Sequence, residues 1–154
     1  MTQTHFSITV QIPAPASLVW SVMVDVERWP EWTASISSVK RFAAAPLQVG
    51  SRVRIQQPKF PPAFWRVTEL NPGEEFTWVS RAPGVCVTAR HAVEAIASGC
   101  CVTLSIRYEG WLGRWLARWT RGLNEAYLAT EAAGLKARGT ELANKAFSEY
   151  HEAR

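Results

Sequence analysis

Hydrophobic and polar residues alternate along the first segment of the chain, between residues 5 and 12. Its apolar positions are Phe6, Ile8, Val10 and Ile12. A period of two predicts a half-buried β-strand. Pro13 and Pro15 follow at once, and Pro15 suits the first position of a helix.

The apolar spacing then changes to that of helices. One helical face carries Leu18, Val19, Val22 and Met23. Asp25 is a favourable N-cap for a second short helix over residues 26–29, which Pro30 is expected to end. The sequence therefore predicts two short helices after the first strand.

From residue 36 onward the period returns to two and predicts six more strands. They cover residues 36–43, 51–57, 63–70, 75–82, 85–95 and 101–109. Turn signals separate the later ones at Asn71-Pro72-Gly73, Pro83-Gly84 and Ser98-Gly99. Consecutive strands with such short connections are typical of an antiparallel meander.

Residues 57–64 interrupt this pattern with Pro58, Pro61 and Pro62 around Phe60. Proline cannot donate to a strand ladder, so the segment is predicted to be a loop. Whether it forms a lid over a cavity is left open by the sequence.

The last part of the chain, from residue 111 to residue 147, is predicted to form one long amphipathic helix. Its apolar face begins with Trp111, Trp115 and Trp119, while Arg114, Arg118, Arg121 and Asn124 fall on the opposite face. Further along, the apolar face carries small residues, namely Ala129, Thr130, Ala133, Gly134 and Ala137. We therefore expect the tryptophans to fill one end of a core and a cavity to lie beside the small residues.

These elements predict an α+β helix-grip architecture in a single domain over residues 1–154. A curved seven-stranded antiparallel sheet would wrap around the long C-terminal helix, with two short helices after the first strand. Three leucines also recur every seven residues on the side of the helix away from the tryptophans, at Leu128, Leu135 and Leu142. They suggest a homodimer seam, although Gly139 interrupts them.

Strand parity turns two polar side chains, His91 and Tyr108, towards the helix, and Tyr127 joins them from the helix. A few polar groups on an apolar wall are typical of a small-molecule pocket. The candidate ligand-binding residues are Trp65, Trp78, His91, Tyr108, Trp119, Tyr127, Thr130 and Gly134. For each of them ordinary core packing is the competing interpretation, and none is assigned a catalytic role.

Composition narrows the function classes. The 154 residues are 47% hydrophobic and 19% charged with a net charge of +4, which indicates a globular chain. No signal peptide or transmembrane run is evident, and the three cysteines make no disulfide framework, so we expect a cytoplasmic protein without stable membrane insertion. Scattered histidines and cysteines give no metal or cofactor site. Nucleic-acid binding is disfavoured because aromatic and basic residues do not interleave.

The sequence resembles the polyketide cyclase/dehydrase-like members of the START/Bet v 1-like (SRPBCC) superfamily. The resemblance rests on Ile12-Pro13-Ala14-Pro15 with Val19-Trp20 and Asp25, on Trp29-Pro30-Glu31-Trp32, on residues 46–53 and on residues 67–73. It implies the helix-grip fold with a deep hydrophobic cavity between sheet and helix. The family has no universal catalytic motif, so no catalytic residue is transferred.

Three functions follow as hypotheses. The first is binding of a hydrophobic or aromatic small molecule, such as a lipid, a quinone or a polyketide-like compound. The second is a cyclase or dehydratase acting in the same cavity, with His91 and Tyr108 as the inward acid–base candidates. The third is association of the Trp111–Trp119 segment with a membrane surface or partner, against the simpler interpretation that its tryptophans fill the sheet.

Overall fold

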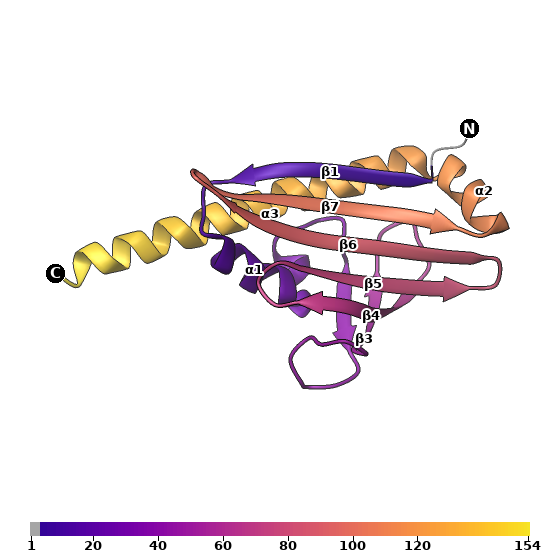
Figure 1. Ribbon diagram of the computed structural model, residues 1–154, viewed down its shortest axis with the longest axis horizontal. Helices are drawn as coiled ribbons and strands as arrows, with labels where there is room; N and C mark the ends of the chain where they lie inside the picture. Colours follow the sequence, from indigo (N-terminus) through magenta and orange to yellow (C-terminus); the bar gives the residue numbers. More distant parts are fainter. Residues whose placement is uncertain (1–3) are drawn as a thin grey trace.

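The seven strands form one antiparallel sheet in the order β1-β7-β6-β5-β4-β3-β2 in the computed structural model, which describes residues 4–154 (Figure 1). The strands are β1 (His5–Ile12), β2 (Ser38–Arg41), β3 (Arg52–Gln56), β4 (Ala63–Asn71), β5 (Glu75–Ala82), β6 (Val85–Ile96) and β7 (Gly99–Glu109). The first strand, β1, pairs antiparallel with the last strand, β7, and forms one edge of the sheet. All seven predicted strands are confirmed.

Two short helical segments follow β1, as predicted. The first is α1 (Ala16–Val24), which begins directly after Pro15. The second, η1 (Val26–Glu31), is a 3-10 helix that contains Pro30, so the expectation that this proline ends the helix was wrong. A 3-10 segment this short depends on few amide hydrogen bonds, and it accommodates proline for that reason.

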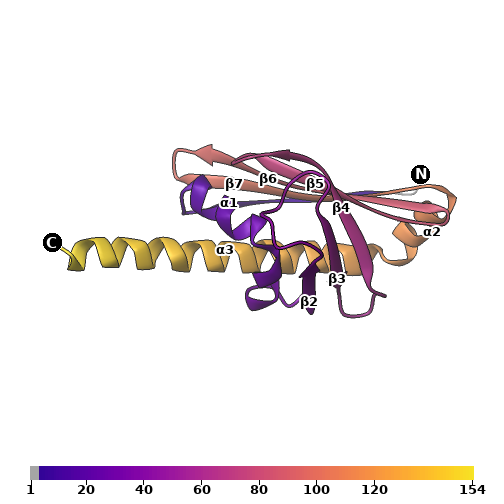
Figure 2. The same cartoon turned by 90° about the horizontal axis from the view of Figure 1, so that it is seen from below.

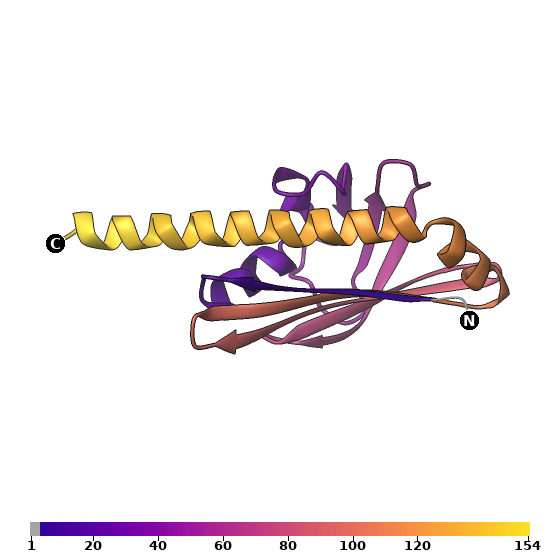
Figure 3. The ribbon, with the colours of Figure 1, turned by 90° about the horizontal axis from the view of Figure 1, so that it is seen from above.

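The C-terminal helix is not continuous. It consists of α2 (Trp111–Trp119) and α3 (Arg121–Glu152), which meet at Thr120, where φ is −101° and ψ is 12°. Seen from below and from above, α3 crosses the concave side of the sheet and extends past it, whereas α2 turns away at the end of the sheet (Figures 2 and 3). The carbonyl of Leu116 accepts both the backbone N–H of Thr120 at 2.8 Å and its hydroxyl at 2.7 Å.

The face that α2 turns to the sheet is not the predicted one. The tryptophans of α2 do not fill the core: Trp111, Trp115 and Trp119 are 73%, 55% and 72% exposed. The buried residues of α2 are instead Gly113 and Ala117, which let the helix approach β6 and β7 closely.

The small residues of α3 lie on its outer side, contrary to the sequence prediction. Ala129, Thr130, Ala133 and Ala137 are exposed. The inward face carries Asn124, Glu131, Ala132, Leu135 and Gly139. The predicted leucine seam was also wrong, because Leu135 is 1% exposed and both Leu128 and Leu142 pack against the core.

Gly134 and Gly139 permit close packing of α3 rather than opening a cavity. A Cβ atom at Gly134 would lie 2.0 Å from the carbonyl oxygen of Trp32. At Gly139 it would lie 3.2 Å from the side chain of Ile12 and 3.3 Å from that of Val19. The absence of side chains at these positions therefore brings α3 against the segments that surround it.

An aromatic cluster forms the centre of the core. The ring centroids of Trp29 and Trp78 are 5.3 Å apart, and those of Trp65 and Trp78 are 5.7 Å apart. The indole nitrogen of Trp29 donates to the carbonyl of Met23 at 3.1 Å, which satisfies the polar group of a side chain that is 2% exposed. This cluster anchors η1 to the middle of the sheet.

No helix within residues 4–154 is long and apolar enough to cross a membrane. In the same described range, no group of three or more His, Cys, Asp or Glu residues is placed to hold a metal ion. Cys86, Cys100 and Cys101 are free thiols.

Candidate ligand-binding cavity

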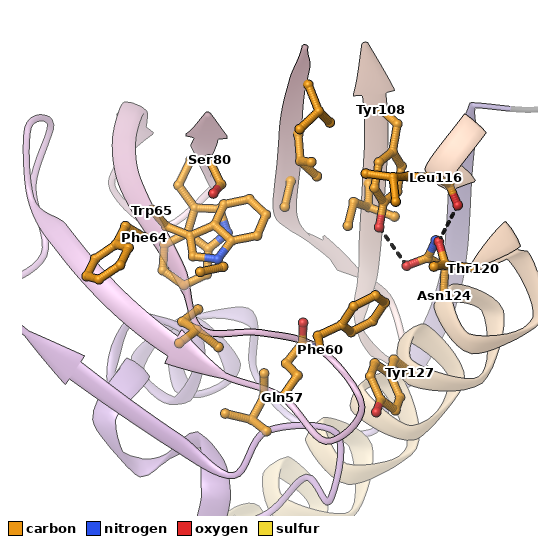
Figure 4. A pocket seen from close by; sticks show the side chains of 18 of the residues that line it. Gln57, Phe60, Phe64, Trp65, Ser80, Tyr108, Leu116, Thr120, Asn124 and Tyr127 are labelled. Carbon is orange, nitrogen blue, oxygen red and sulfur yellow. Dashed lines mark hydrogen bonds between the residues drawn. The ribbon is translucent and has the colours of Figure 1, made fainter. Parts of the chain in front are cut away.

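A cavity of about 500 Å³ lies between the concave face of the sheet and the α2–α3 junction. Strands β4 to β7 form one wall, and Leu112, Leu116 and Leu128 contribute from the helices. In Figure 4, Trp65 and Ser80 lie across the cavity from Tyr108 and Asn124. The cavity therefore sits beside the first half of the C-terminal helical region rather than the second.

The wall of the cavity is predominantly apolar. Alternation along the strands directs Val87 and Ala89 of β6 and Leu104 and Ile106 of β7 into it. Trp65 and Trp78 add indole faces from β4 and β5. Such a surface suits an apolar or aromatic molecule.

One polar pair on the wall joins β6 to α3. His91 Nε2 lies 3.1 Å from Glu131 Oε1, and the two residues are 5% and 8% exposed. The imidazole stacks on Phe76 with a centroid distance of 4.6 Å and an interplanar angle of 6°. The other ring nitrogen, Nδ1, is buried and has no hydrogen-bond partner within residues 4–154. The carboxylate and the stacked ring together hold the imidazole in one orientation.

A second polar chain joins β7 to the helix break. The hydroxyl of Tyr108 donates to Asn124 Oδ1 at 2.9 Å, and the amide nitrogen of Asn124 donates to Thr120 Oγ1 at 3.0 Å. Burial raises the pKa of the Tyr108 phenol, while its hydrogen bonds to Asn124 and Thr120 oppose that rise. The phenol is therefore neutral at physiological pH and serves as a hydrogen-bonding group.

The loop between β3 and β4 forms one side of the mouth. The hydroxyl of Tyr127 donates to the carbonyl of Pro58, and the ring of Phe60 meets that of Tyr127 edge-on at 5.8 Å. Gln56 Nε2 donates to the carbonyl of Phe60 at 2.9 Å. These contacts tie the loop to both β3 and α3, and Figure 4 shows Phe60 and Tyr127 together at this side of the cavity.

The mouth can be located from the cavity residues that are exposed. They are Pro61, Pro62, Phe64, Arg81 and Ala82. We call these five residues the rim. The rim thus runs from the β3–β4 loop to the end of β5, where the turn into β6 begins.

The structure brings five of the eight sequence-predicted site residues to the cavity wall: Trp65, Trp78, His91, Tyr108 and Tyr127. Trp119, Thr130 and Gly134 lie outside it. Trp119 faces solvent, Thr130 donates its hydroxyl to the carbonyl of Ala126 in its own helix, and Gly134 packs against Trp32. At about 100° per residue, the buried residues of α2 and α3 share the face opposite the tryptophans. Expecting the tryptophans to point inward therefore placed these three positions in the site wrongly.

Sequence reasoning missed Asn124 and Glu131, the partners of Tyr108 and His91. The predicted continuous helix put Asn124 on the solvent side. One signal of the break was present: Thr120 and Gly122 are both weak helix formers, and threonine is a favourable N-cap. The polar residues were missed because the face that they share with Gly113 and Ala117, at about 100° per residue, was taken as the solvent side.

Comparisons with known proteins agree with this architecture. A hypothetical protein from Helicobacter pylori superimposes with a TM-score of 0.72 at 15% identity, over 88% of this chain and 86% of its own. A START superfamily protein from Mycobacterium smegmatis gives a TM-score of 0.71 at 16% identity, over 91% and 99% of the two chains. At these identities the likeness concerns the fold.

The di-domain ARO/CYC StfQ of the steffimycin biosynthetic pathway is also similar, with a TM-score of 0.71 at 13% identity. The match covers 92% of this chain and 52% of StfQ. None of the curated proteins matches the sequence significantly.

A family model described as polyketide cyclase / dehydrase and lipid transport matches residues 3–139. The match includes every strand, both short helices, α2 and the half of α3 that lines the cavity. The chain therefore belongs to this family, and its helix-grip fold resembles that of the START superfamily protein.

Proposed function

We propose that the protein binds a hydrophobic or aromatic small molecule in the cavity between the sheet and the α2–α3 junction. The observation that carries this proposal is a cavity of about 500 Å³ with an apolar wall and two hydrogen-bonded polar groups. Pockets for small molecules in proteins occupy about 300–1,000 Å³. Family membership supports the same class of ligand.

The polar groups define the chemistry of the ligand more closely. The Tyr108 hydroxyl and the Asn124 amide can meet a hydroxyl or carbonyl group, and the indoles of Trp65 and Trp78 can contact a flat ring or an acyl chain. Lipids, quinones and polyketide-like compounds all combine an apolar body with such groups. The ligand is therefore expected to be mostly apolar and to carry an oxygen at one end.

Filling the cavity tests this proposal. Val87 lies on the wall, so Val87→Trp should place an indole in the cavity and abolish ligand binding. Thr88→Trp is the matched control, because Thr88 is the next residue of β6 and lies outside the cavity wall. Native mass spectrometry of the purified proteins, followed by denaturing extraction, measures the bound compound.

The expected result is an apolar compound on the wild type and on Thr88→Trp but not on Val87→Trp. Where no compound co-purifies, titration with the apolar dye anilinonaphthalene sulfonate provides the same comparison. If folded Val87→Trp binds as much ligand or dye as the wild type does, the cavity is not the binding site.

A second candidate function is cyclisation or dehydration of a polyketide-like substrate in the same cavity. The buried His91–Glu131 pair favours it, since a histidine oriented by a carboxylate is suited to general acid–base catalysis. His91→Ala and Glu131→Gln should then lower turnover of such a substrate about 100-fold or more, the usual contribution of a general base. Full turnover by folded His91→Ala would exclude this role.

A further inference from the structure

Helix α2 presents three tryptophans to solvent at one end of the molecule. Trp111 and Trp119 are nearly three-quarters exposed, and the rings of Trp115 and Trp119 lie side by side with centroids 5.6 Å apart. Exposed indole surface of this size is unfavourable in water and marks a surface that contacts another apolar phase. We call Trp111, Trp115 and Trp119 the tryptophan stripe.

The faces of α2 follow a fixed order around its axis. At about 100° per residue, the stripe lies between the leucines that line the cavity, Leu112 and Leu116, and two arginines, Arg114 and Arg118. The opposite face, with Gly113 and Ala117, is buried on the sheet. The stripe is thus the outward continuation of the cavity wall, and the arginines border it on its other side.

The stripe also lies close to the mouth of the cavity. The ring of Trp111 packs over the β5–β6 turn, where a Cβ atom at Gly84 would be 2.7 Å from it. Arg81 and Ala82 of the rim immediately precede this turn. In Figure 1, α2 and the connection from β5 to β6 occupy the same end of the molecule. A flat surface contacting α2 would therefore also meet this end of the rim, at Arg81 and Ala82.

The charge around the stripe is predominantly positive. Arg81, Arg114 and Arg118 are exposed and make no ion pair within residues 4–154. The acidic residue Glu109 is exposed beside the start of α2, and Glu125 is paired with Arg121 at 3.2 Å. Three unpaired guanidinium groups therefore face outward together with the indoles.

We propose that α2 is a docking helix for an anionic lipid surface and that it holds the mouth of the cavity against that surface. Tryptophan prefers the boundary between lipid headgroups and acyl chains, and arginine beside it attracts anionic headgroups. A second protein would also cover indoles, but the unpaired arginines and the adjoining apolar mouth favour lipid. Docking needs no occupant in the cavity, so it goes beyond the proposed binding function.

Vesicle flotation tests the proposal. The wild type should bind vesicles of equal parts phosphatidylcholine and phosphatidylglycerol at low ionic strength, should bind vesicles of phosphatidylcholine alone much more weakly, and should be released by added salt. Quenching of tryptophan fluorescence by brominated acyl chains should accompany binding. Both measurements use the full chain without any added ligand.

Two double variants separate the contribution of the indoles to vesicle binding from that of the arginine charges. Trp115→Ala/Trp119→Ala should lower the partition constant by at least roughly ten-fold, because two indoles lose their apolar contact. Arg114→Gln/Arg118→Gln should lower it by roughly 30-fold on anionic vesicles, from about five-fold per arginine near such a surface. None of the four residues lines the cavity, so ligand binding by the variants remains a separate measurement.

The matched control is Phe147→Ala/Tyr150→Ala, which removes two equally exposed aromatic residues from the far end of α3. This variant should bind anionic vesicles as the wild type does. Absence of wild-type binding at low ionic strength would overturn the proposal, as would equal loss in the control. A dimer that forms through the stripe without vesicle binding would assign the surface to a second copy instead.

Discussion

Gly134 shows how a single residue without a side chain determines where α3 lies. Its Cα faces the carbonyl of Trp32, and a Cβ atom there would lie 2.0 Å from that oxygen. Helix propensity alone favours alanine over glycine by about 0.8–1 kcal/mol. The steric conflict is with backbone rather than with the end of a flexible side chain, so it outweighs that preference.

We predict that Gly134→Ala lowers the free energy of unfolding by about 1–3 kcal/mol, the usual cost of forcing an extra methyl group into a packed site. Urea unfolding followed by circular dichroism measures the change. Larger residues at this position should prevent folding rather than block a ligand site, because Gly134 packs against Trp32 and lies outside the cavity wall.

Gly122 provides the matched control. It lies in the first turn of the same helix, and a Cβ atom there would meet nothing within 4 Å. Gly122→Ala should therefore raise the free energy of unfolding by about 0.5–1 kcal/mol. The same small gain in Gly134→Ala would show that α3 does not approach Trp32 as closely as the structure has it.

Polar residues of the cavity divide into those that the sequence could reveal and those that it could not. His91 and Tyr108 lie on strands, where alternation assigns a face without any further information. Asn124 and Glu131 lie on a helix, where the face depends on the phase of the whole segment. Expecting the exposed tryptophans of α2 to point inward fixed that phase wrongly and sent Asn124 to the solvent side.

At the scale of elements, the strands were predictable and the C-terminal helices were predictable only in part. The apolar stripe of α2 correctly predicted a helix but not which face is buried. The sheet contacts the narrow face of Gly113 and Ala117, because small residues allow the helix backbone to approach β7. Large apolar residues are usually buried, and that general rule led to the wrong face here.

The β3–β4 loop is a second element whose role could not be read from the sequence. Its prolines correctly predicted the end of strand pairing, but its position over the cavity follows from contacts with a distant segment. Tyr127, which holds the loop through Pro58, is far away in the sequence. Contacts of this kind depend on the packing of the complete fold.

For the whole molecule, the strand pattern and the family resemblance together predicted the architecture, a curved seven-stranded antiparallel sheet around one helix. The location of the cavity was predicted on the wrong half of that helix. The cavity lies beside the α2–α3 break, whereas Gly134 packs closely against Trp32 farther along α3. Residue size along one helix does not determine the position of the cavity.

A surface ion pair between η1 and β2 predicts that the stability of the protein depends on acidic pH. Glu27 of η1 accepts hydrogen bonds from Arg41 of β2: Nε at 3.1 Å and Nη2 at 3.0 Å reach Oε2, and the backbone amide at 3.1 Å reaches Oε1. The hydrogen bonds from the Arg41 amide and guanidinium lower the pKa of the Glu27 carboxyl below its ordinary value of 4.5. The folded state therefore binds a proton at Glu27 less readily than the unfolded chain does.

The stabilisation from Glu27 should be complete above the unfolded pKa and should be lost as the pH falls through the lower pKa of the folded state. Glu27→Gln should thus reduce the free energy of unfolding at neutral pH by about 0.2–1 kcal/mol, the range for exposed ion pairs. The difference from wild type should disappear in more acidic solution, where the wild-type carboxyl is itself protonated. Urea unfolding over a series of pH values measures this difference in the free energy of unfolding. Glu69→Gln is the control, because Glu69 is exposed on β4 and makes no ion pair within residues 4–154. If the free energies of unfolding of Glu27→Gln and wild type differ by the same amount at neutral and acidic pH, the charge of the Glu27 carboxylate does not stabilise the contact between η1 and β2.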